Sequence, residues 1–191
     1  MTAVVVASGS PRRRELLARV GFDVRVVPPD VDETRLPGEQ PVDYAIRLAR
    51  VKVAAVPAAS TLACVAADTI VHRGTEVWGK PADRDDAVQI LRALSGASHE
   101  VTTAFAVRCG ERVEARAVTT RVRFRVLTDR EIATYVASGE ADDKAGAYGI
   151  QGAAGAFVAE VHGSWTNVMG LPVEEVLAVL ASFGVRPEGQ R

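Results

Sequence analysis

The sequence predicts an α/β fold built around a mixed β-sheet. Strand-like and helix-like segments alternate over the first half of the chain, and two long strand-like segments then follow one another directly. Such alternation favours parallel strands with helices between them, whereas consecutive long strands favour antiparallel pairing. The 191 residues, of which 48% are hydrophobic and 25% charged, suit one domain or two tightly joined lobes that share a core.

The chain begins with a strand, a helix and a second strand. Residues 4–7 are a β-branched apolar run without alternation, which predicts a buried strand. Ser10-Pro11 then predicts a helix start, because serine suits the N-cap and proline the first helical position. The helix should stop at Gly21, and residues 22–27 return as a strand.

A polar loop at residues 28–41 precedes the second helix, at residues 42–56, which a proline ends. Residues 62–71 are an apolar run that predicts a third buried strand, finishing on Ala67-Asp68-Thr69, and a turn follows at residues 74–81. An amphipathic pattern predicts the next helix, up to residue 94.

The second half should begin with an antiparallel pair of strands, residues 99–108 and 112–127, joined at Cys109-Gly110-Glu111. The second of them alternates, with one apolar side and the other side basic. The apolar side is Val118, Thr120, Val122, Phe124 and Val126, and the basic side is Arg121, Arg123 and Arg125. The remaining elements are a helix capped by Thr128-Asp129, a glycine-rich loop at 143–155, a strand at 156–161 and a helix at 171–183.

Charge and cysteine content exclude several classes of function. The formal net charge is −1, so any bound anion must be held by a local cluster of cations, and we expect no specific nucleic-acid partner. Two cysteines, Cys64 and Cys109, lie in apolar runs and suit a reduced chain better than a disulfide framework. We find no signal peptide and no run near the roughly 20 apolar residues of a membrane span. We therefore expect a cytoplasmic protein.

The first helix start carries the pattern Ser8-Gly9-Ser10-Pro11-Arg12-Arg13. A helix N-terminus offers unpaired N–H groups and the positive end of the helix dipole, and arginine forks match phosphate oxygens. A capped helix with a solvated basic first turn is the alternative. Basic residues there oppose the helix dipole, which favours a bound anion.

Two lysines are candidates for the same anion. Lys52 stacks above Ala45 and Leu48 on the apolar face of its helix, so it either points into a cleft or extends past small neighbours to solvent. Lys80 lies in the tight turn Trp78-Gly79-Lys80-Pro81 and would be unremarkable alone.

Two acidic positions are candidates for a metal site. Asp68 ends an apolar strand, where ligands of open α/β sheets bind, although it could simply cap the following turn. Glu33 belongs to an acidic loop with Asp30 and Asp32, which could equally be solvated surface. Together with the cations, these carboxylates suit Mg²⁺ or Mn²⁺ bound with a polyphosphate.

Other polar residues are interpreted as structural. His72, His99 and His162 lack metal-ligand spacing, and the arginines of the basic strand side are read as solvated rather than as a nucleic-acid surface. Ser8 has no evident histidine and acidic partner, so a serine hydrolase is not expected.

Eight sequence blocks, in order from residue 7 to residue 172, resemble the Maf nucleotide pyrophosphatases. They are ASGSPRRRELL, the Asp32-Glu33 pair, LARVKV around Lys52, AADTIV, WGKP, LSGASHEVTT, DKAGAYGIQG and GSWTNVMGLP. The block from Ala145 to Gly152 is similar to the branch that acts on dTTP and UTP. Trp165 is the one departure, at a position where the family pattern has tyrosine.

The resemblance implies a Maf/ITPase-like elongated mixed sheet with flanking helices, with two lobes around a central cleft, in a single domain spanning residues 1–191 that forms a homodimer. It implies hydrolysis of a nucleoside triphosphate, dTTP or UTP, to the monophosphate and pyrophosphate. Asp68 would be the proton acceptor, and Glu33 and Asp68 would lie near the divalent metal. The resemblance places phosphates at Arg13, Lys52 and Lys80, beside Ser8 and Ser10 of the helix start. It associates Arg12, Thr69 and Gln151 with choice of base.

Two alternatives stay open at the level of sequence. One is a pyrophosphatase for purine or methylated nucleotides, and the other is a non-catalytic regulator of cell division that binds nucleotides or nucleic acid. The intact Glu33, Asp68, Lys52 and Lys80 speak against the second.

Overall fold

The sheet order in a computed structural model confirms the mixed α/β fold. The structure describes residues 2–57 and 62–188, so residues 1, 58–61 and 189–191 of the expected domain lie outside it. The described strands form a seven-stranded sheet in the order β2-β1-β3-β5-β6-β7, with β4 attached to β3. The strands are β1 (Thr2–Ala7), β2 (Phe22–Val26), β3 (Ala63–Arg73), β4 (Glu76–Trp78), β5 (Ser98–Cys109), β6 (Arg112–Phe124) and β7 (Val158–His162). Pairing is parallel from β1 to β2 and β3, and antiparallel from β3 to β4 and from β6 to β7.

The chain packs as two compact units. The first consists of Met1–Asp68, Thr103–Val118 and Gly170–Arg191, and the second of Thr69–Thr102 and Thr119–Met169. The limits of the units fall within β3, β5 and β6, so each of these strands supplies a stretch to each unit. The single domain and its central cleft stay predictions.

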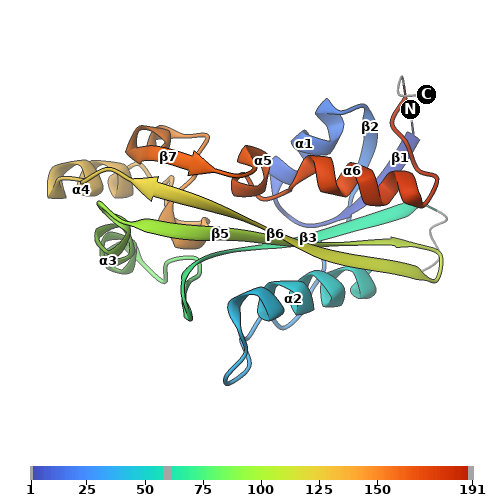
Figure 1. Cartoon of the computed structure of the whole chain (residues 1–191), viewed down its shortest axis with the longest axis horizontal. Helices are drawn as coiled ribbons and strands as arrows, with labels where there is room; N and C mark the ends of the chain where they lie inside the picture. Colours follow the sequence, from blue (N-terminus) through green and yellow to red (C-terminus); the bar gives the residue numbers. More distant parts are fainter. Residues whose placement is uncertain (1, 58–61, 189–191) are drawn as a thin grey trace. The chain divides into compact units, whose positions relative to one another are not determined.

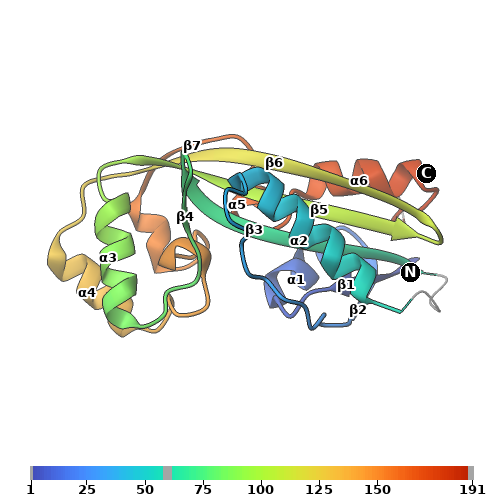
Figure 2. The ribbon, with the colours of Figure 1, turned by 90° about the horizontal axis from the view of Figure 1, so that it is seen from below.

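In the first unit, helices cover both faces of the strands. Helix α2 (Pro41–Ala55) lies on one face, and α1 (Pro11–Arg19) and α6 (Val173–Ser182) lie on the other (Figures 1 and 2). Strands β2 and β3 flank β1 on opposite sides, so right-handed crossovers place α1 and α2 on opposite faces. The buried core of this unit includes Val4, Val5, Val6, Leu17, Phe22, Leu48, Val53, Phe105, Val176 and Leu180.

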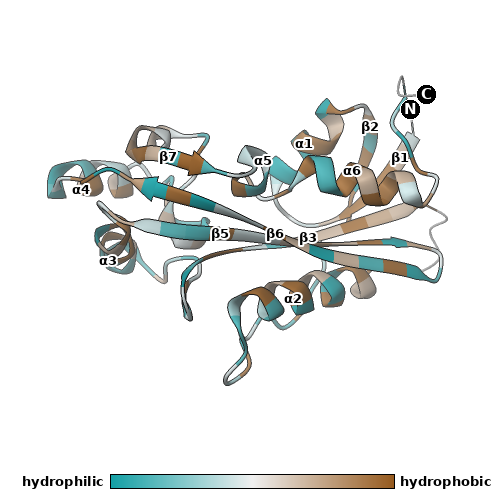
Figure 3. Cartoon of the chain, viewed as in Figure 1, coloured by the Kyte–Doolittle hydropathy of each residue, from teal (hydrophilic) through white to brown (hydrophobic). Residues whose placement is uncertain are grey.

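The termini of these helices follow the sequence signals closely. Pro11 is the first residue of α1, and the chain leaves that helix at Gly21, whose φ of +97° is in the region that favours glycine. Pro41 likewise begins α2, one residue earlier than predicted. Figure 3 shows α2 changing between hydrophobic and hydrophilic residues along its length, as an amphipathic helix does.

The second unit is built around β4, α3 (Arg84–Leu94) and α4 (Asp129–Ala137), and the two helices lie side by side (Figure 2). Helix α4 begins with a capping box, in which Thr128 and Glu131 satisfy each other's backbone N–H groups. Aromatic rings meet edge to face in the core of this unit: His99 lies 5.0 Å from Phe124 and 5.5 Å from Tyr148, between ring centroids.

Several predicted boundaries in the second unit are wrong. β6 ends at Phe124 rather than at residue 127, and Val126, expected on the apolar side, is 78% exposed. The chain leaves the ladder there because the backbone of Arg125 bonds to Gly96 and Phe157 instead. β4 was predicted as part of a turn, since three residues are too few to show alternation. The short helices η1 (Ala145–Ala147), η2 (Ala153–Phe157) and α5 (Trp165–Val168) were not predicted.

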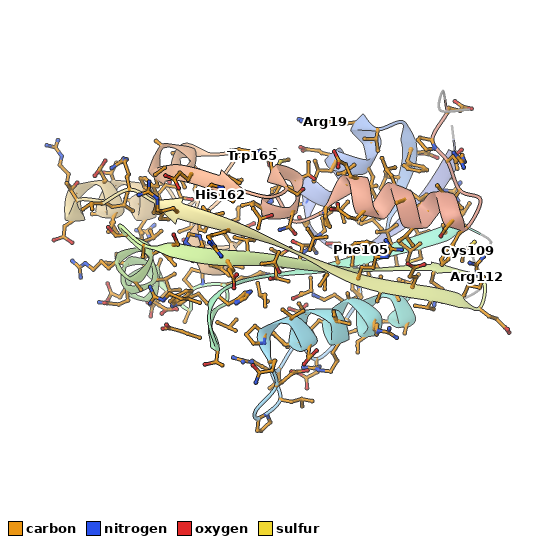
Figure 4. All side chains as sticks on the ribbon, in the orientation of Figure 1. Arg19, Phe105, Cys109, Arg112, His162 and Trp165 are labelled. Carbon is orange, nitrogen blue, oxygen red and sulfur yellow. The ribbon has the colours of Figure 1, made fainter. Side chains whose placement is uncertain are left out.

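Both cysteines are free thiols, as expected. Cys64 is buried and Cys109 is half-buried. Figure 4 shows Cys109 and Arg112 flanking the turn between β5 and β6, where the guanidinium of Arg112 stacks over the ring of Phe183 at 4.4 Å. Within residues 2–57 and 62–188, no helix is long and apolar enough to cross a bilayer.

Candidate active site

The carboxyl end of β1 is where the candidate residues of the first unit converge. β1 ends at Ala7, which pairs with Ala66 of β3, so Asp68 lies two residues beyond the end of the parallel ladder. The sequence prediction that Asp68 ends its own strand is wrong, because β3 continues to Arg73. Asp68 still lies near a position where open α/β sheets bind ligands, because the helices that follow β1 and β2 lie on opposite faces of the sheet. Open α/β sheets bind ligands at such a switch point.

The segment between β1 and α1 is organised by Ser8. This serine is buried, and its Oγ accepts hydrogen bonds from the backbone N–H of Ser10 at 3.2 Å and from Nη1 of Arg13 at 2.9 Å. Ser10 is the N-cap residue of α1, yet its side chain makes no cap hydrogen bond, and the first turn holds no acidic residue. A side chain added at Gly9 would meet no atom within 4 Å. The N-terminus of α1 is therefore open to an anion.

The two arginines of α1 differ in their surroundings. Arg13 is anchored, because its Nε donates to the carbonyl of Gly170 at 2.9 Å in addition to its bond with Ser8. Burial lowers the pKa of Arg13 from its usual value, against the attraction of Asp68 and Glu33. Arg12 has a buried Nε without a hydrogen-bond partner among the described residues. A buried donor of this kind calls for an acceptor, and a phosphate oxygen would supply one.

Lys52 lies at the centre of a cluster of three charged side chains, which it forms with Asp68 and Glu33. It is 6% exposed, and its Nζ donates to Oδ1 of Asp68 at 2.6 Å and lies 2.7 Å from Oε1 of Glu33. Its place on the apolar face of α2, beside Leu48 and Ala49, confirms that this lysine points inward rather than to solvent. An ammonium thus joins two carboxylates that are 35 positions apart in sequence.

The family of this chain follows from a comparison with protein-family models. The model described as "Maf-like protein" matches residues 3–183. The chain belongs to the Maf family. A dTTP/UTP pyrophosphatase of Anaeromyxobacter dehalogenans is 54% identical over 95% of this chain and 94% of that protein. A dTTP/UTP pyrophosphatase of Chromobacterium violaceum is 49% identical over 96% of each chain. Among solved structures, a HAM1 protein of Coxiella burnetii aligns with 95% of this chain and 100% of its own, at 19% identity and a TM-score of 0.47.

The carboxylates of this Maf protein suit a divalent cation that is shared with a substrate. Among the described residues, no group of three or more histidine, cysteine, aspartate or glutamate side chains could hold a metal. Glu33 and Asp68 together supply a pair of carboxylates within reach of one ammonium. Mg²⁺ is commonly bound by one or two carboxylates and completes its octahedron with water and phosphate oxygens. The donor set therefore fits such an ion in the presence of a polyphosphate.

Three predicted site residues belong to the second unit of the Maf chain. Thr69 follows Asp68 on β3 and is half-buried, and Lys80 is exposed after β4. Gln151 is exposed between η1 and η2. Their roles stay predictions. Trp165, the departure from the family pattern, is 47% exposed at the start of α5, near His162 (Figure 4).

The residues read as structural lie as follows. His72 and His99 are buried in the second unit, whereas the side chain of His162 is 69% exposed. Arg123 and Arg125 form ion pairs with Glu160 and Glu131, at 2.5 and 2.6 Å. Sequence reasoning missed three residues of the first unit, Glu39, Tyr44 and Arg47, which contact the backbone or side chains around Glu33.

Proposed function

We propose that this chain is a nucleoside triphosphate pyrophosphatase that hydrolyses dTTP and UTP to the monophosphate and pyrophosphate. Membership of the Maf family and the names of two relatives with about half of their residues identical support the substrate. The observation that carries the chemistry is the position of Lys52, held between Asp68 and Glu33. A buried cation bound to two carboxylates, next to an open helix N-terminus, suits a polyphosphate better than a neutral ligand.

Asp68 is the proposed proton acceptor for the water that attacks the α-phosphorus. Lys52 binds its Oδ1, which fixes the orientation of the carboxylate and leaves the second oxygen to accept a proton from water. Asp68 is 8% exposed, so bulk water competes weakly for that oxygen. Positioning and charge stabilisation supply most of the rate in phosphoryl chemistry.

Phosphate oxygens are bound in this proposal by the start of α1 and by lysines. Ser8 and Ser10 offer hydroxyl and backbone donors, and Arg12 and Arg13 offer guanidinium donors. Lys52 and Lys80 would hold the leaving pyrophosphate, and Thr69 and Gln151, together with Arg12, would contribute to the choice of base. The amide of a glutamine both donates and accepts, as a uracil-type edge requires.

A divalent cation, Mg²⁺ or Mn²⁺, would be held by Glu33 and Asp68 and would neutralise charge on the phosphate oxygens. We further propose that the protein acts in the cytoplasm, and that it forms a homodimer, as the family resemblance implies.

The test is pyrophosphate release from dTTP, UTP, CTP, dITP and a methylated GTP in the presence of Mg²⁺. We expect dTTP and UTP to be turned over fastest. Asp68→Asn should bind nucleotide and lose about 10²–10⁴-fold in turnover, as enzymes do when a general base is removed. Asp23→Asn, at an exposed position of β2 in the same unit, is the matched control and should keep wild-type activity. Wild-type turnover by Asp68→Asn would remove Asp68 from its role, and faster turnover of dITP or methylated GTP would change the substrate class.

A further inference from the structure

Glu33 lies in a long segment without regular secondary structure, yet its side chain reaches a buried lysine. The chain has neither helix nor strand from residue 27 to residue 40, between β2 and α2. The side chain of Glu33 is 53% exposed, but its Oε1 lies 2.7 Å from Nζ of Lys52. An irregular segment of this length samples many conformations unless side chains hold it. Something must therefore fix the backbone of Glu33.

Tyr44 holds that backbone directly. Its Oη donates a hydrogen bond to the carbonyl oxygen of Glu33 at 2.7 Å. A tyrosine phenol is protonated at neutral pH, so Tyr44 is a hydrogen-bond donor to this carbonyl.

Arg47 holds the same segment at two further points. Its Nη2 donates to the carbonyl of Thr34 at 3.0 Å. Its Nε and Nη2 bind the two carboxylate oxygens of Glu39 at 2.6 and 2.8 Å, a bidentate pair. The bond to Arg47 lowers the pKa of Glu39 to about 2, so the pair stays charged at neutral pH. Glu39 in turn accepts a hydrogen bond from the backbone N–H of Leu36 at 3.1 Å.

The contacts of Tyr44 and Arg47 lie close to the cluster of Lys52, Asp68 and Glu33 because all of them involve helix α2. Tyr44, Leu48 and Lys52 are spaced four residues apart on α2, so Tyr44 and Lys52 lie two turns apart along one side of the helix. Glu33 is therefore held by one helix at two places, its carbonyl by Tyr44 and its carboxylate by Lys52. Arg47, three residues after Tyr44, fixes the next residue of the segment.

We propose that Tyr44 and Arg47 are positioning residues, which hold residues 33–39 against α2 so that the carboxylate of Glu33 is presented to Lys52 and the substrate phosphates. The proposal rests on the proposed pyrophosphatase activity. Neither residue needs to touch the substrate, because each acts through the backbone of the segment that carries Glu33.

The experiment combines hydrogen exchange with kinetics on the full-length chain. In Tyr44→Phe, which removes one hydroxyl, and in Arg47→Gln, backbone amides of residues 33–39 should exchange at least about tenfold faster than in the wild type. Turnover of dTTP at saturation should fall about tenfold, because a misplaced Glu33 carboxylate stabilises the transition state less well. KM should change by less than about threefold, because the lost interaction is made in the transition state and not in the bound substrate. Arg116→Gln removes an Arg–Glu ion pair elsewhere in the same unit and should leave both measurements unchanged.

Combining Tyr44→Phe with Glu33→Gln distinguishes a specific effect on the position of Glu33 from a general loss of stability. If Tyr44 acts through Glu33, then Tyr44→Phe should cause no further loss of kcat in a Glu33→Gln protein, because coupled residues are not additive. Unchanged exchange in residues 33–39, unchanged kcat in Tyr44→Phe, or full additivity with Glu33→Gln would each overturn the positioning role. Those outcomes leave the pyrophosphatase proposal intact. A wild-type protein that releases no pyrophosphate would instead overturn the function, whatever the exchange rates show.

Discussion

Replacing Lys52 by methionine tests the ion cluster of Lys52, Asp68 and Glu33, because methionine keeps most of the unbranched apolar stem of the side chain and removes the ammonium with its charge. The ammonium lies 2.6 Å from Asp68 and 2.7 Å from Glu33. Two unit charges about 4 Å apart attract by about 4 kcal/mol at an effective dielectric constant of 20. The side chain of Asp68 is only 11% exposed, so the variant leaves a nearly buried carboxylate without its ammonium. Breaking a buried pair in this way typically costs about 3–5 kcal/mol.

Two features of the site place the expected cost at the lower end of that range. Arg13 still attracts Asp68, and Glu33 is half exposed and can turn to water. We therefore expect Lys52→Met to lose about 3 kcal/mol of unfolding free energy. For a chain of this size the loss corresponds to about 6–12 °C in Tm.

The assay is urea and thermal unfolding of four proteins: wild type, Lys52→Met, Asp68→Asn and the double variant. The double variant removes both the ammonium and the carboxylate that it neutralises, so it should be more stable than Lys52→Met alone by at least about 1 kcal/mol. Arg116→Met, which breaks an exposed pair with Glu114, is the control and should lose less than about 1 kcal/mol. A loss below 1 kcal/mol in Lys52→Met, or a double variant less stable than it, would refute the reasoning.

Three further predictions follow from other contacts. Arg12→Gln should weaken binding of pyrophosphate about tenfold in calorimetry without lowering Tm, because the buried Nε has no partner to lose in the described structure. Burial lowers the pKa of His99 to about 4, so the folded state binds this proton less readily than the unfolded chain, and stability should fall as the pH drops below 6.5. His99 should contribute about 2 kcal/mol of that loss between pH 7 and pH 5 in urea unfolding, and His99→Leu should not show it. Gly146→Ala should lose roughly 2–4 kcal/mol, because the new Cβ would lie 2.7 Å from Val71 at a φ of +69°, whereas Gly74→Ala, at a φ of +60° with open space, should lose about 1 kcal/mol.

The parts of the site that obey a local rule could be predicted from sequence. Lys52 falls on the apolar face of α2 by spacing alone, and its burial confirms that direction. Ser10 and Pro11 predicted the start of α1 because capping preferences depend only on neighbouring residues. The same is true of Thr128, whose capping box opens α4.

Contacts that cross long sequence distances could not be predicted in this way. Asp68 and Lys52 meet only because β3 and α2 pack together, and no periodicity reports which strand a helix covers. Tyr44 and Arg47 looked like ordinary helix residues, since their partners lie in a segment without any pattern. Val126 continued the alternation of β6 in sequence, but its backbone neighbour Arg125 pairs outside the ladder. Tertiary hydrogen bonding overrode the local preference there.

The donor count of Lys52 explains how one residue can serve both the carboxylates and a phosphate. A lysine ammonium has three N–H donors, and Asp68 and Glu33 use two of them in the described structure. The third donor is left for a phosphate oxygen, so a nucleotide can bind without breaking either ion pair. The charges agree with this arrangement, because Arg12, Arg13 and Lys52 outnumber the two carboxylates by one. A guanidinium at position 52 would make a worse substitute, since its planar fork binds one carboxylate at two points and has no compact point charge to share among three anions. Lys52→Arg should therefore keep the positive charge but lose most of the turnover of dTTP, and pyrophosphate release at saturating substrate would measure that loss.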